Sequence, residues 1–504
     1  MDPLTSEDLV ERSNGNIAQY GYREEVQENN ENGFEETFRT GIRRQRDKIL
    51  YTGGFRRLQD KTQVMSSTIS GDHRTRLTHT LEVEQIAVSI ANALQLNTDL
   101  VSAIALGHDV GHTPFGHAAE RKLNELLKDY GGFHHPIQSV KYLWEKYEDK
   151  IASVIYEGIL LHDSDMFTIG EDEATGQLKF VKNGGEKLLR EFFNKYPSTL
   201  EAQVVIWADK IAYITHDLED FLRSQIFVNA KKSNTKLEEN LCCILNELID
   251  GKEIKTLKDF ELRDLIRNLV TNLINSSCAN IGNFGDFKQT DVKVLTEKNN
   301  ESGDKNKKAY LDNLIINFEK EYRDSYYNLR KLLDEAYILS PEVQRSDAKA
   351  QVIVEWLFNM LTSNYKLMPL NIRDDIDNTI IYELEKNNYL KELNEKLINM
   401  QGELSGYNKF IEELKVNYSE FNKNEDNNTI ENKMKYYNDL KKLNDKLSNK
   451  SDKVKDFLEV IEKCMDIEKN VIYRKVAAYI ATMSDSYAEN MYRNLIGTKV
   501  DFIL

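Results

Sequence analysis

Apolar residues recur at helical spacing along most of the chain. Residues 77–94 (LTHTLEVEQIAVSIANAL) repeat apolar side chains every three or four positions, and residues 99–109 (DLVSAIALGHD) form an apolar run that ends in polar residues. These patterns are typical of an amphipathic helix and of a buried helix, respectively. Proline is scarce, with 6 residues, and glycine is modest, with 24. The sequence therefore predicts a mainly all-α protein.

Two polar stretches break the helical pattern. Residues 165–185 contain short β-like pieces bounded by glycine, and we expect a small hairpin there. Residues 283–308 are polar and dotted with Gly and Asn, which is typical of a loop or a short β excursion. Minor β pieces are therefore expected beside the helices.

A regular apolar repeat occupies residues 385–470. Apolar positions from Leu390 to Phe421 follow a strict spacing of three and four residues, and the spacing resumes from Leu440 to Cys464 after a polar turn. Two heptad-patterned helices joined by a turn predict a long antiparallel helical hairpin. Its role stays open between a structural element and an arm for oligomerisation or for a partner.

These patterns divide the chain into five segments. The first is polar and rich in Asn and Glu, which favours a poorly ordered arm or a loose cap. The second holds all the candidate chemistry. In order, the segments are a polar N-terminal arm (1–35), a helical catalytic core (36–230), a helical continuation with a polar loop at 283–308 (231–384), the heptad-patterned hairpin (385–470) and a C-terminal helix that packs back on the core (471–504).

Net charge limits the partners that the surface can bind. The chain carries a formal charge of −16, which argues against nucleic-acid binding across the whole surface. Between Arg39 and Arg76, however, ten Lys or Arg residues stand against only three Asp. Such a basic segment suits a compact anion, and the alternative is a solvated basic helix face.

The pattern gives no sign of a membrane or secretory segment. It contains no run of about 18 apolar residues, and the N-terminal MDPLTSEDLVERSNGN lacks the basic-then-apolar order of a signal peptide. We therefore expect a cytoplasmic protein with no membrane partner. The cysteines show no CxxC spacing, so we expect buried thiols without a metal or disulfide role. They are Cys242, Cys243, Cys278 and Cys464.

The candidate chemistry is concentrated in GHDVGHTPFGH at residues 107–117, which holds three of the nine histidines. His108 and Asp109 close the buried helix, while His79 and Asp209 lie within other predicted helices. Two imidazoles and two carboxylates from different helices would give a mixed N/O metal site with positions left open for water and a phosphate oxygen. Such a site suits Mn, Fe, Mg, Co or Zn.

The dipeptide His-Asp is by itself a weak signal, since it occurs three times. Only the pair at 108–109 lies in a dense histidine neighbourhood after an apolar helix. The pair at 162–163 is interpreted as a surface or loop pair. In the third, His216 is interpreted as a bystander on its helix.

Helical spacing places further polar groups beside this site. Arg76 precedes His79 by three residues and shares its face, so its guanidinium could hold an anion near the metal. Asp209, Tyr213 and Asp217 recur at four-residue intervals on one face. A metal ligand, an aromatic plane and a hydroxyl acceptor in this order suit a metal-bound phosphate, a sugar and its hydroxyl group.

Six stretches of the chain occur in the order found in one family. By them the chain resembles the HD-superfamily deoxynucleoside triphosphate triphosphohydrolases, the bacterial dGTPase type. An ordinary HD phosphohydrolase would share only the H, HD and D positions. The stretches are RRQRDKILYTGGFRRLQDKTQV (43–64), HRTRLTHTLEV (73–83), ALGHDVGHTPFGHAAE (105–120), GGFHHPIQS (131–139), WADKIAYITHDLED (207–220) and AAYIATMSDSYAENMYRNL (477–495).

The resemblance implies an HD-domain helical core that hydrolyses a deoxynucleoside triphosphate, dGTP in the first place. The products would be the deoxynucleoside and inorganic triphosphate, formed by attack of water at the α-phosphorus. The resemblance also implies one divalent metal ion per site (Mn, Mg, Fe or Co), a homo-oligomer such as a hexamer, and a dNTP or single-stranded DNA as an allosteric effector. The metal ligands would be His79, His108, Asp109 and Asp209.

The matching motifs also imply roles for other polar residues. His117, with Glu120 one turn further on, would transfer protons, because an imidazole suits both the leaving oxygen and the attacking water. His112 and His135 would contact the phosphates around the scissile bond. Pro114 is expected to end the helix after His112, so that His117 lies on a turn. The substrate-binding residues would be Arg76 and Lys210 for the triphosphate, Tyr213 under the deoxyribose, and Gln63 with Asp217 on the side of the 3′-hydroxyl group.

Two other functions stay open on the sequence alone. An HD phosphodiesterase or nucleotidase would release a monophosphate, and His134 and His135 could then bind a second metal. A nucleotide or single-stranded DNA sensor would bind without turnover. Such a sensor would normally tolerate loss of His117 or Glu120, and both residues are present.

Overall fold

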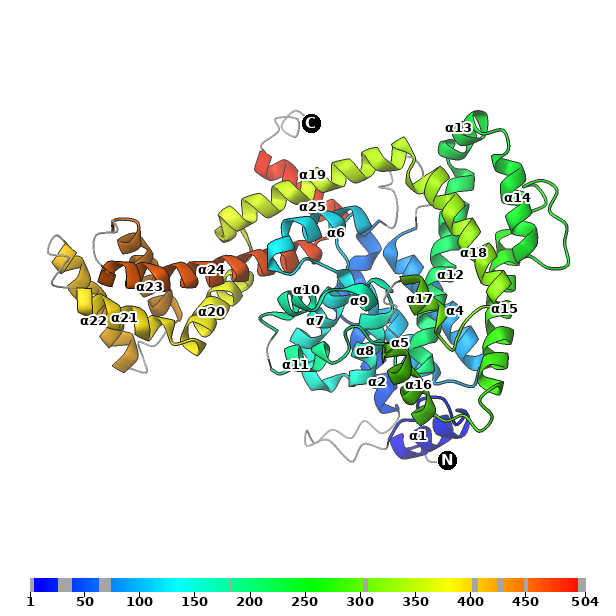
Figure 1. Cartoon of the computed structure of the whole chain (residues 1–504), viewed down its shortest axis with the longest axis horizontal. Coiled ribbons are helices and arrows are strands. Elements are labelled where there is room, and N and C mark those ends of the chain that lie inside the picture. Colours follow the sequence, from blue (N-terminus) through cyan, green and yellow to red (C-terminus); the bar gives the residue numbers. More distant parts are fainter. Residues whose placement is uncertain are drawn as a thin grey trace. The chain divides into compact units, whose positions relative to one another are not determined.

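The computed structural model describes residues 4–25, 39–62, 74–181, 183–301, 307–400, 407–423, 430–447 and 452–496. Within these residues the protein is helical (Figure 1), as the apolar spacing predicts. The described residues form no strand, and a single antiparallel bridge joins Thr62 to Thr75. The fold class is therefore all-α, and the expectation of minor β pieces is wrong for the described residues. None of the described helices is both long enough and apolar enough to cross a membrane.

The chain divides into two compact units. The first joins Met1–Glu355 to Ile480–Leu504, and the second is Trp356–Tyr479. The boundaries between the units fall within α19 (Pro341–Ser363) and next to the end of α24 (Asp452–Ala481). The other helices of the first unit are α1 (Ser6–Gly15), α2 (Gly41–Leu50), α3 (Gly53–Arg57), α4 (Arg76–Ala93), α5 (Thr98–Gly107), α6 (Gly116–Leu126), α7 (His135–Tyr147), α8 (Ser153–Leu161), α9 (Asp165–Thr168), α10 (Glu171–Leu178), α11 (Gly185–Arg190), α12 (Leu200–Arg223), α13 (Gln225–Ser233), α14 (Leu237–Leu248), α15 (Leu262–Gly282), α16 (Gln289–Glu301), α17 (Lys307–Asp312), α18 (Lys320–Leu333) and α25 (Asp485–Ile496).

Helix α5 is the central element of the first unit. Every residue from Leu100 to Gly107 is buried, and α5 contacts α2, α4, α8 and α12. A helix that is apolar on all sides is stable only where it is covered on all sides. The end of α5 therefore delivers His108 and Asp109 into the interior of the unit.

The described N-terminal residues pack against the core, so the expectation of a loose arm is wrong for residues 4–25. Val10 is buried. The carboxylate of Glu201 on α12 accepts hydrogen bonds from the backbone nitrogens of Tyr22 and Asn97, at 2.8 and 3.0 Å. The rest of the predicted arm lies outside the described residues.

Both stretches expected to hold β structure are helical where they are described. Residues 165–185 contain α9, α10 and the start of α11, and residues 283–308 contain α16 and the start of α17. Short glycine-bounded pieces fit a strand or a helical turn equally well, so the pattern alone could not decide between them. Gly176 in α10 instead allows a close approach, because a Cβ there would lie 2.7 Å from the Cα of Gly131.

The second unit contains the heptad-patterned segment. It includes α20 (Leu370–Lys386), α21 (Tyr389–Met400), α22 (Asn408–Lys423) and α23 (Ile430–Asn444), together with most of α24. Beyond the last residues of α20, the described helical residues of the segment 385–470 thus lie in four helices, α21 to α24, where the pattern predicts two. Helix α22 contacts both α21 and α23, so the apolar stripe is covered within the chain, which favours a structural role. Its buried members are Leu390, Leu393, Leu397, Met400, Ile411, Leu414, Leu440, Leu443, Val454, Phe457, Ile461 and Cys464.

The cysteines are free thiols, as the absence of CxxC spacing predicts. Cys242 and Cys464 are buried, but Cys243 and Cys278 are exposed. The expectation of buried thiols is therefore wrong for two of the four.

Candidate metal-dependent active site

Three of the predicted metal ligands meet in the interior of the first unit. His79 comes from α4, His108 directly follows α5, and Asp209 comes from α12. The Nε2 atom of His79 lies 3.0 Å from Oδ1 of Asp209, and Nε2 of His108 lies 3.9 Å from the same oxygen. One ligand atom from each residue lies within 4.8 Å of the other two.

The imidazole of His108 is prepared to bind a cation. Its Nδ1 atom lies 2.6 Å from the carbonyl oxygen of Ala105, which fixes the proton on Nδ1. Its Nε2 atom is buried and has no hydrogen-bond partner. A buried unpaired nitrogen beside a carboxylate and a second imidazole fits a divalent cation with a mixed N/O ligand set.

Asp109, the fourth predicted ligand, is held by Arg76. The Nη1 atom of Arg76 donates to Oδ2 of Asp109 at 2.6 Å, and both side chains are buried. Burial disfavours the charged carboxylate, but Arg76 and the nearby histidines outweigh this effect and hold the pKa of Asp109 well below its usual range. Its Oδ2 atom lies 3.6 Å from Nε2 of His108, so Asp109 borders the same site.

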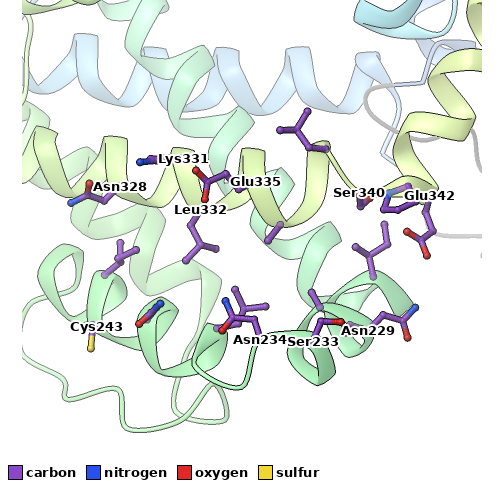
Figure 2. A pocket seen from close by; sticks show the side chains of 18 of the residues that line it. Asn229, Ser233, Asn234, Cys243, Asn328, Lys331, Leu332, Glu335, Ser340 and Glu342 are labelled. Atoms are coloured by element: carbon purple, nitrogen blue, oxygen red, sulfur yellow. Dashed lines mark hydrogen bonds between the residues drawn. The ribbon is translucent and has the colours of Figure 1, made fainter.

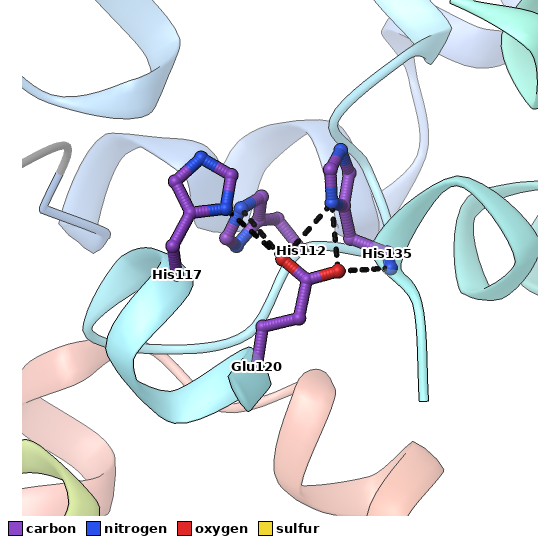
Figure 3. A group of neighbouring side chains, drawn as sticks. All are labelled: His112, His117, Glu120 and His135. Atoms are coloured by element: carbon purple, nitrogen blue, oxygen red, sulfur yellow. Dashed lines mark hydrogen bonds and ion pairs between the residues drawn. The ribbon is translucent and has the colours of Figure 1, made fainter. Parts of the chain in front are cut away.

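A second group of side chains lies beside this set (Figure 3). Its centre is Glu120 on α6. The Nδ1 atoms of His117 and His135 lie 3.1 and 2.9 Å from the Glu120 carboxylate, and Nε2 of His112 lies 3.8 Å away. Burial lowers the pKa of His135, but the charge and hydrogen bonds of Glu120 outweigh it and raise the pKa to about 9. The four residues predicted for catalysis are therefore neighbours in the structure.

The local helix boundary differs from the one predicted at Pro114. Helix α5 ends at Gly107, well before His112, and residues 108–115 of the polar motif lie outside any helix. His117 lies in the first turn of α6, and the prediction that it lies on a turn outside a helix is wrong. The residue before α6, Phe115, has a φ of 59° in the left-handed region.

The pair at 162–163 lies in the turn between α8 and α9, as one of the two interpretations had it, but the interpretation as a surface pair is wrong. His162 is 2% exposed, and burial, together with His108 and His135, lowers its pKa to about 4. It ends α8 as His108 ends α5, since its Nδ1 lies 2.7 Å from the carbonyl oxygen of Ile159. Its Nε2 lies 3.3 Å from Nε2 of His135. The signal in the sequence was the apolar run VIYEGILL before it.

His216 is more than a bystander. Its Nδ1 lies 3.4 Å from Nδ1 of His79, and its Nε2 forms an ion pair with Glu82. His216 therefore contacts the Nδ1 side of the His79 ring, while Nε2 of His79 faces Asp209.

The site opens into a cavity of about 690 Å³. Lys210 and Tyr213 line it, as the spacing on α12 predicts, and so does Arg330 of α18. The guanidinium carbon of Arg330 lies 4.3 Å from the centre of the Tyr213 ring, and its Nη1 donates to Oδ2 of Asp217 at 2.8 Å. Asp217 has no exposed surface, so it reaches the cavity only through Arg330, which the sequence did not single out.

The remaining predicted contributors are Gln63 and the basic segment 39–76. Gln63 falls outside the described residues. Among the described cations of the basic segment 39–76, only Arg76 lines the cavity. Arg39 and Arg46 pair with Asp47, and Arg46 also lies 3.8 Å from a carboxylate oxygen of Asp99, so these two cations have carboxylate partners away from the cavity.

His134, which the alternative of a second metal required, has a different partner. Its Nε2 lies 2.9 Å from Oε1 of Glu173. The metal-like groups found among the described residues include His135 but not His134.

Another cavity, of about 870 Å³, lies along α13, α14 and α18 (Figure 2). Its charged lining residues are one cation, Lys331, and the carboxylates of Glu247, Glu335 and Glu342. No histidine lines it, so it lacks the proton-transferring groups that the first cavity has. The candidate chemistry therefore belongs to the histidine-lined cavity.

The comparisons with known proteins agree with this geometry. Residues 76–214 match the HD domain, and residues 316–381 match the phosphohydrolase-associated domain. The first match spans the four metal-ligand candidates and the second contains Arg330. The fold and the site thus define a metal-dependent phosphohydrolase of the HD class.

Curated relatives narrow the class further. A "deoxyguanosinetriphosphate triphosphohydrolase-like protein" of Rickettsia canadensis is 32% identical over 354 residues, which cover 69% of this chain and 87% of the relative. A protein of the same name from Caldanaerobacter subterraneus subsp. tengcongensis is 35% identical over 335 residues, 66% of this chain and 75% of the relative. The chain belongs to this deoxyguanosinetriphosphate triphosphohydrolase-like family.

Proposed function

We propose that the protein hydrolyses deoxynucleoside triphosphates, with dGTP as the preferred substrate, to the deoxynucleoside and inorganic triphosphate. The observation that carries the proposal is the contact of His117 and His135 with Glu120 beside the set of His79, His108 and Asp209. The names of the relatives support dGTP as the substrate.

One divalent cation, Mn, Mg, Fe or Co, fits this site. When bound by His79, His108, Asp109 and Asp209, it would lower the pKa of water and draw charge away from the α-phosphate. The protein's own contribution is to keep these four side chains in place. Arg76 orients Asp109, His216 orients His79, and the Ala105 carbonyl orients His108.

The reaction needs one proton removed and one supplied. Attack of water at the α-phosphorus forms a P–O bond and breaks the bond to the 5′-oxygen, so the water loses a proton and the leaving oxygen gains one. His117 is suited to the transfer, because its side chain is 42% exposed while its Nδ1 contacts Glu120. His135, which lines the cavity, contacts the phosphates around the scissile bond. The phosphate contact expected of His112 is not part of the proposal, because its side chain has no exposed surface.

The remaining cavity residues hold the rest of the nucleotide. Lys210 and Arg76 offset the charge of the triphosphate. Tyr213 packs under the deoxyribose, where a ring against C2′ leaves no room for the hydroxyl group of a ribonucleotide. Gln63 and Asp217 serve the side of the 3′-hydroxyl group, Asp217 through Arg330.

Product analysis tests this function. The full chain is incubated with Mn²⁺ and each dNTP, singly and mixed, and the products are separated by chromatography. We expect nucleoside and intact triphosphate, from dGTP above all, with little turnover of GTP. Release of a monophosphate would instead identify a phosphodiesterase or nucleotidase, and tight binding without any product would identify a sensor.

The mixed incubation tests for an allosteric effector, and light scattering tests the oligomeric state. Acceleration of one dNTP's hydrolysis by another, or by single-stranded DNA, is expected if the protein has an allosteric effector. Light scattering on the protein as it elutes from a size-exclusion column gives its molar mass. We expect the mass of a homo-oligomer, such as a hexamer.

A further inference from the structure

Four potential ligand atoms converge at Glu120 (Figure 3). They come from His112, His117, Glu120 and His135, and all lie within 4.8 Å of one another. This group shares no residue with the set of His79, His108 and Asp209. It is therefore a second place where the described residues could hold a cation.

The spacing within the group is close to that of a zinc site. Oε1 of Glu120 accepts a hydrogen bond from the backbone nitrogen of His135 at 2.7 Å and lies 2.9 Å from Nδ1 of His135, whereas Oε2 lies near all three rings. From Oε2, the Nδ1 atoms of His117 and His135 both lie at 3.1 Å, and Nε2 of His112 at 3.8 Å. In a tetrahedral site with Zn–N distances of about 2.0–2.1 Å, neighbouring ligand atoms lie about 3.3 Å apart. Small side-chain movements would therefore complete the tetrahedron.

The neighbours of two rings set which nitrogens are available as ligands. His162 points its Nδ1 at a carbonyl oxygen, so its Nε2 accepts a hydrogen bond from Nε2 of His135. Nδ1 of His135, which faces Glu120, would give up its proton to the solvent when a cation binds there. Nδ1 of His112 faces the Thr113 carbonyl oxygen at 3.3 Å, which leaves its Nε2.

A separate observation marks His112 as lacking a partner. Its side chain has no exposed surface, and its Nε2 is buried without a hydrogen bond. Buried polar atoms are normally satisfied, so such an atom aimed at a carboxylate indicates a missing ligand. A contact between His117 and Glu120 alone would not require His112 at all.

We propose that His112, His117, Glu120 and His135 form a second cation site, selective for Zn²⁺, and that zinc bound there inhibits the enzyme. Three imidazoles and one carboxylate are a donor set that zinc favours, whereas Mg²⁺ and Mn²⁺ favour oxygen ligands. The exposed edge of His117 gives the ion a path from the cavity. The inhibition rests on the proposed function, because zinc would occupy the nitrogens of the proton-transferring pair. The binding itself does not.

Zinc stoichiometry tests the site without any activity assay. The full chain is stripped with a chelator, dialysed against Zn²⁺ and analysed for bound metal. We expect two zinc ions per chain in the wild type and one each in His117→Ala and Asp209→Ala. His134→Ala is the matched control and should keep two, because this histidine pairs with Glu173 instead. One zinc ion in the wild type, or two in His117→Ala, would overturn the proposal.

Kinetics test the inhibition. Zinc added to the Mn²⁺-loaded wild type should lower kcat by about 100-fold, the scale of a lost general acid or base, and a chelator should reverse the effect. The residual activity of His117→Ala should not respond to the same zinc concentrations. An equal response of both proteins would show that zinc acts by replacing the first cation, which overturns the inhibitory role. If no dNTP is hydrolysed at all, the proposed function fails while the stoichiometry still decides the site.

Discussion

The guanidinium carbon of Arg330 lies 4.3 Å from the centre of the Tyr213 ring. The same guanidinium pairs with Asp217, whose pKa burial raises to about 7 against the opposing charge of Arg330. One arginine on α18 thus contacts both residues of α12 that we propose for the sugar of the substrate. Arg330→Met should therefore raise KM for the dNTP more than it lowers kcat, as steady-state kinetics can measure.

Measurements of stability separate the effect of Arg330→Met on substrate binding from its effect on the buried ion pair with Asp217. Arg330→Met leaves a buried carboxyl group unpaired, which should cost up to about 3 kcal/mol of unfolding free energy in urea titrations. Arg330→Met with Asp217→Asn should recover most of this loss while KM stays high. A double variant as unstable as the single one would mean that the ion pair is not the source of the effect.

Removal of the metal should abolish activity and lower the Tm. A chelator should do both in the wild type, and added Mn²⁺ should restore both, since a ligand that binds the folded state stabilises it. In Asp209→Asn the affinity for Mn²⁺ should fall at least about 100-fold, because one charged ligand becomes neutral. Isothermal titration calorimetry measures this change. His134→Ala should bind Mn²⁺ as the wild type does, and an equal loss in that variant would contradict the assigned ligands.

The sequence predicts some of this site and misses other parts for physical reasons. His79 and Asp209 could be predicted because each is a polar residue within a helix that the apolar spacing predicts, and their predicted meeting is found. His162 was missed because no other histidine is near it in the sequence, although the apolar helix before it favours a buried end. Arg330 could not be found from spacing, because its pairing with Asp217 depends on how α18 packs against α12. The division of the heptad segment into four helices likewise depends on packing rather than period.

His162 should support catalysis through His135. Its Nε2 is the acceptor that fixes the proton of His135, so His162→Leu leaves a buried donor unpaired and frees that ring to turn. We expect kcat to fall about 10-fold or more, with KM nearly unchanged. His162→Gln keeps an acceptor and should retain more activity than His162→Leu. Equal kcat values in the two variants would mean that only the space filled by the ring matters.

Lys61 should make stability depend on pH. Burial lowers its pKa to about 7 from the usual 10.5, although its ammonium group donates to the carbonyl oxygens of His112 and Ala481. Between these two values the unfolded chain binds more protons than the folded one. The free energy of unfolding should therefore rise from about pH 7 to pH 10, by at most about 1.4 kcal/mol per pH unit from this group.

Urea titrations at several pH values measure that rise. Lys61→Met has no group that titrates at this position, so its free energy of unfolding should not show the rise that Lys61 causes between pH 7 and pH 10. Lys61→Arg stays charged throughout this range and should lack it as well. Curves for the wild type and both variants that run parallel from pH 7 to pH 10 would exclude Lys61 as its source.

Asp485 should position the catalytic turn from the far end of the sequence. Its Oδ1 accepts from the backbone nitrogen of Phe115 at 2.8 Å, and its Oδ2 accepts from the backbone nitrogen of Thr62 at 2.9 Å. Phe115 holds a left-handed backbone conformation directly before α6, which costs about 1 kcal/mol or more for a residue other than glycine. The hydrogen bond that Phe115 donates to Asp485 helps to keep Phe115 there, and with it the orientation of His117.

Loss of this carboxylate should therefore affect kcat rather than metal binding. In Asp485→Ala we expect kcat to fall about 10-fold, because a small displacement of His117 weakens proton transfer. The Mn²⁺ content should stay at the wild-type value, since the proposed ligands of the cation come from α4, α12 and the end of α5. Asp485→Asn keeps one acceptor oxygen, so its kcat should lie between those of the wild type and Asp485→Ala. Reduced Mn²⁺ content together with reduced kcat would mean instead that Asp485 supports the whole core.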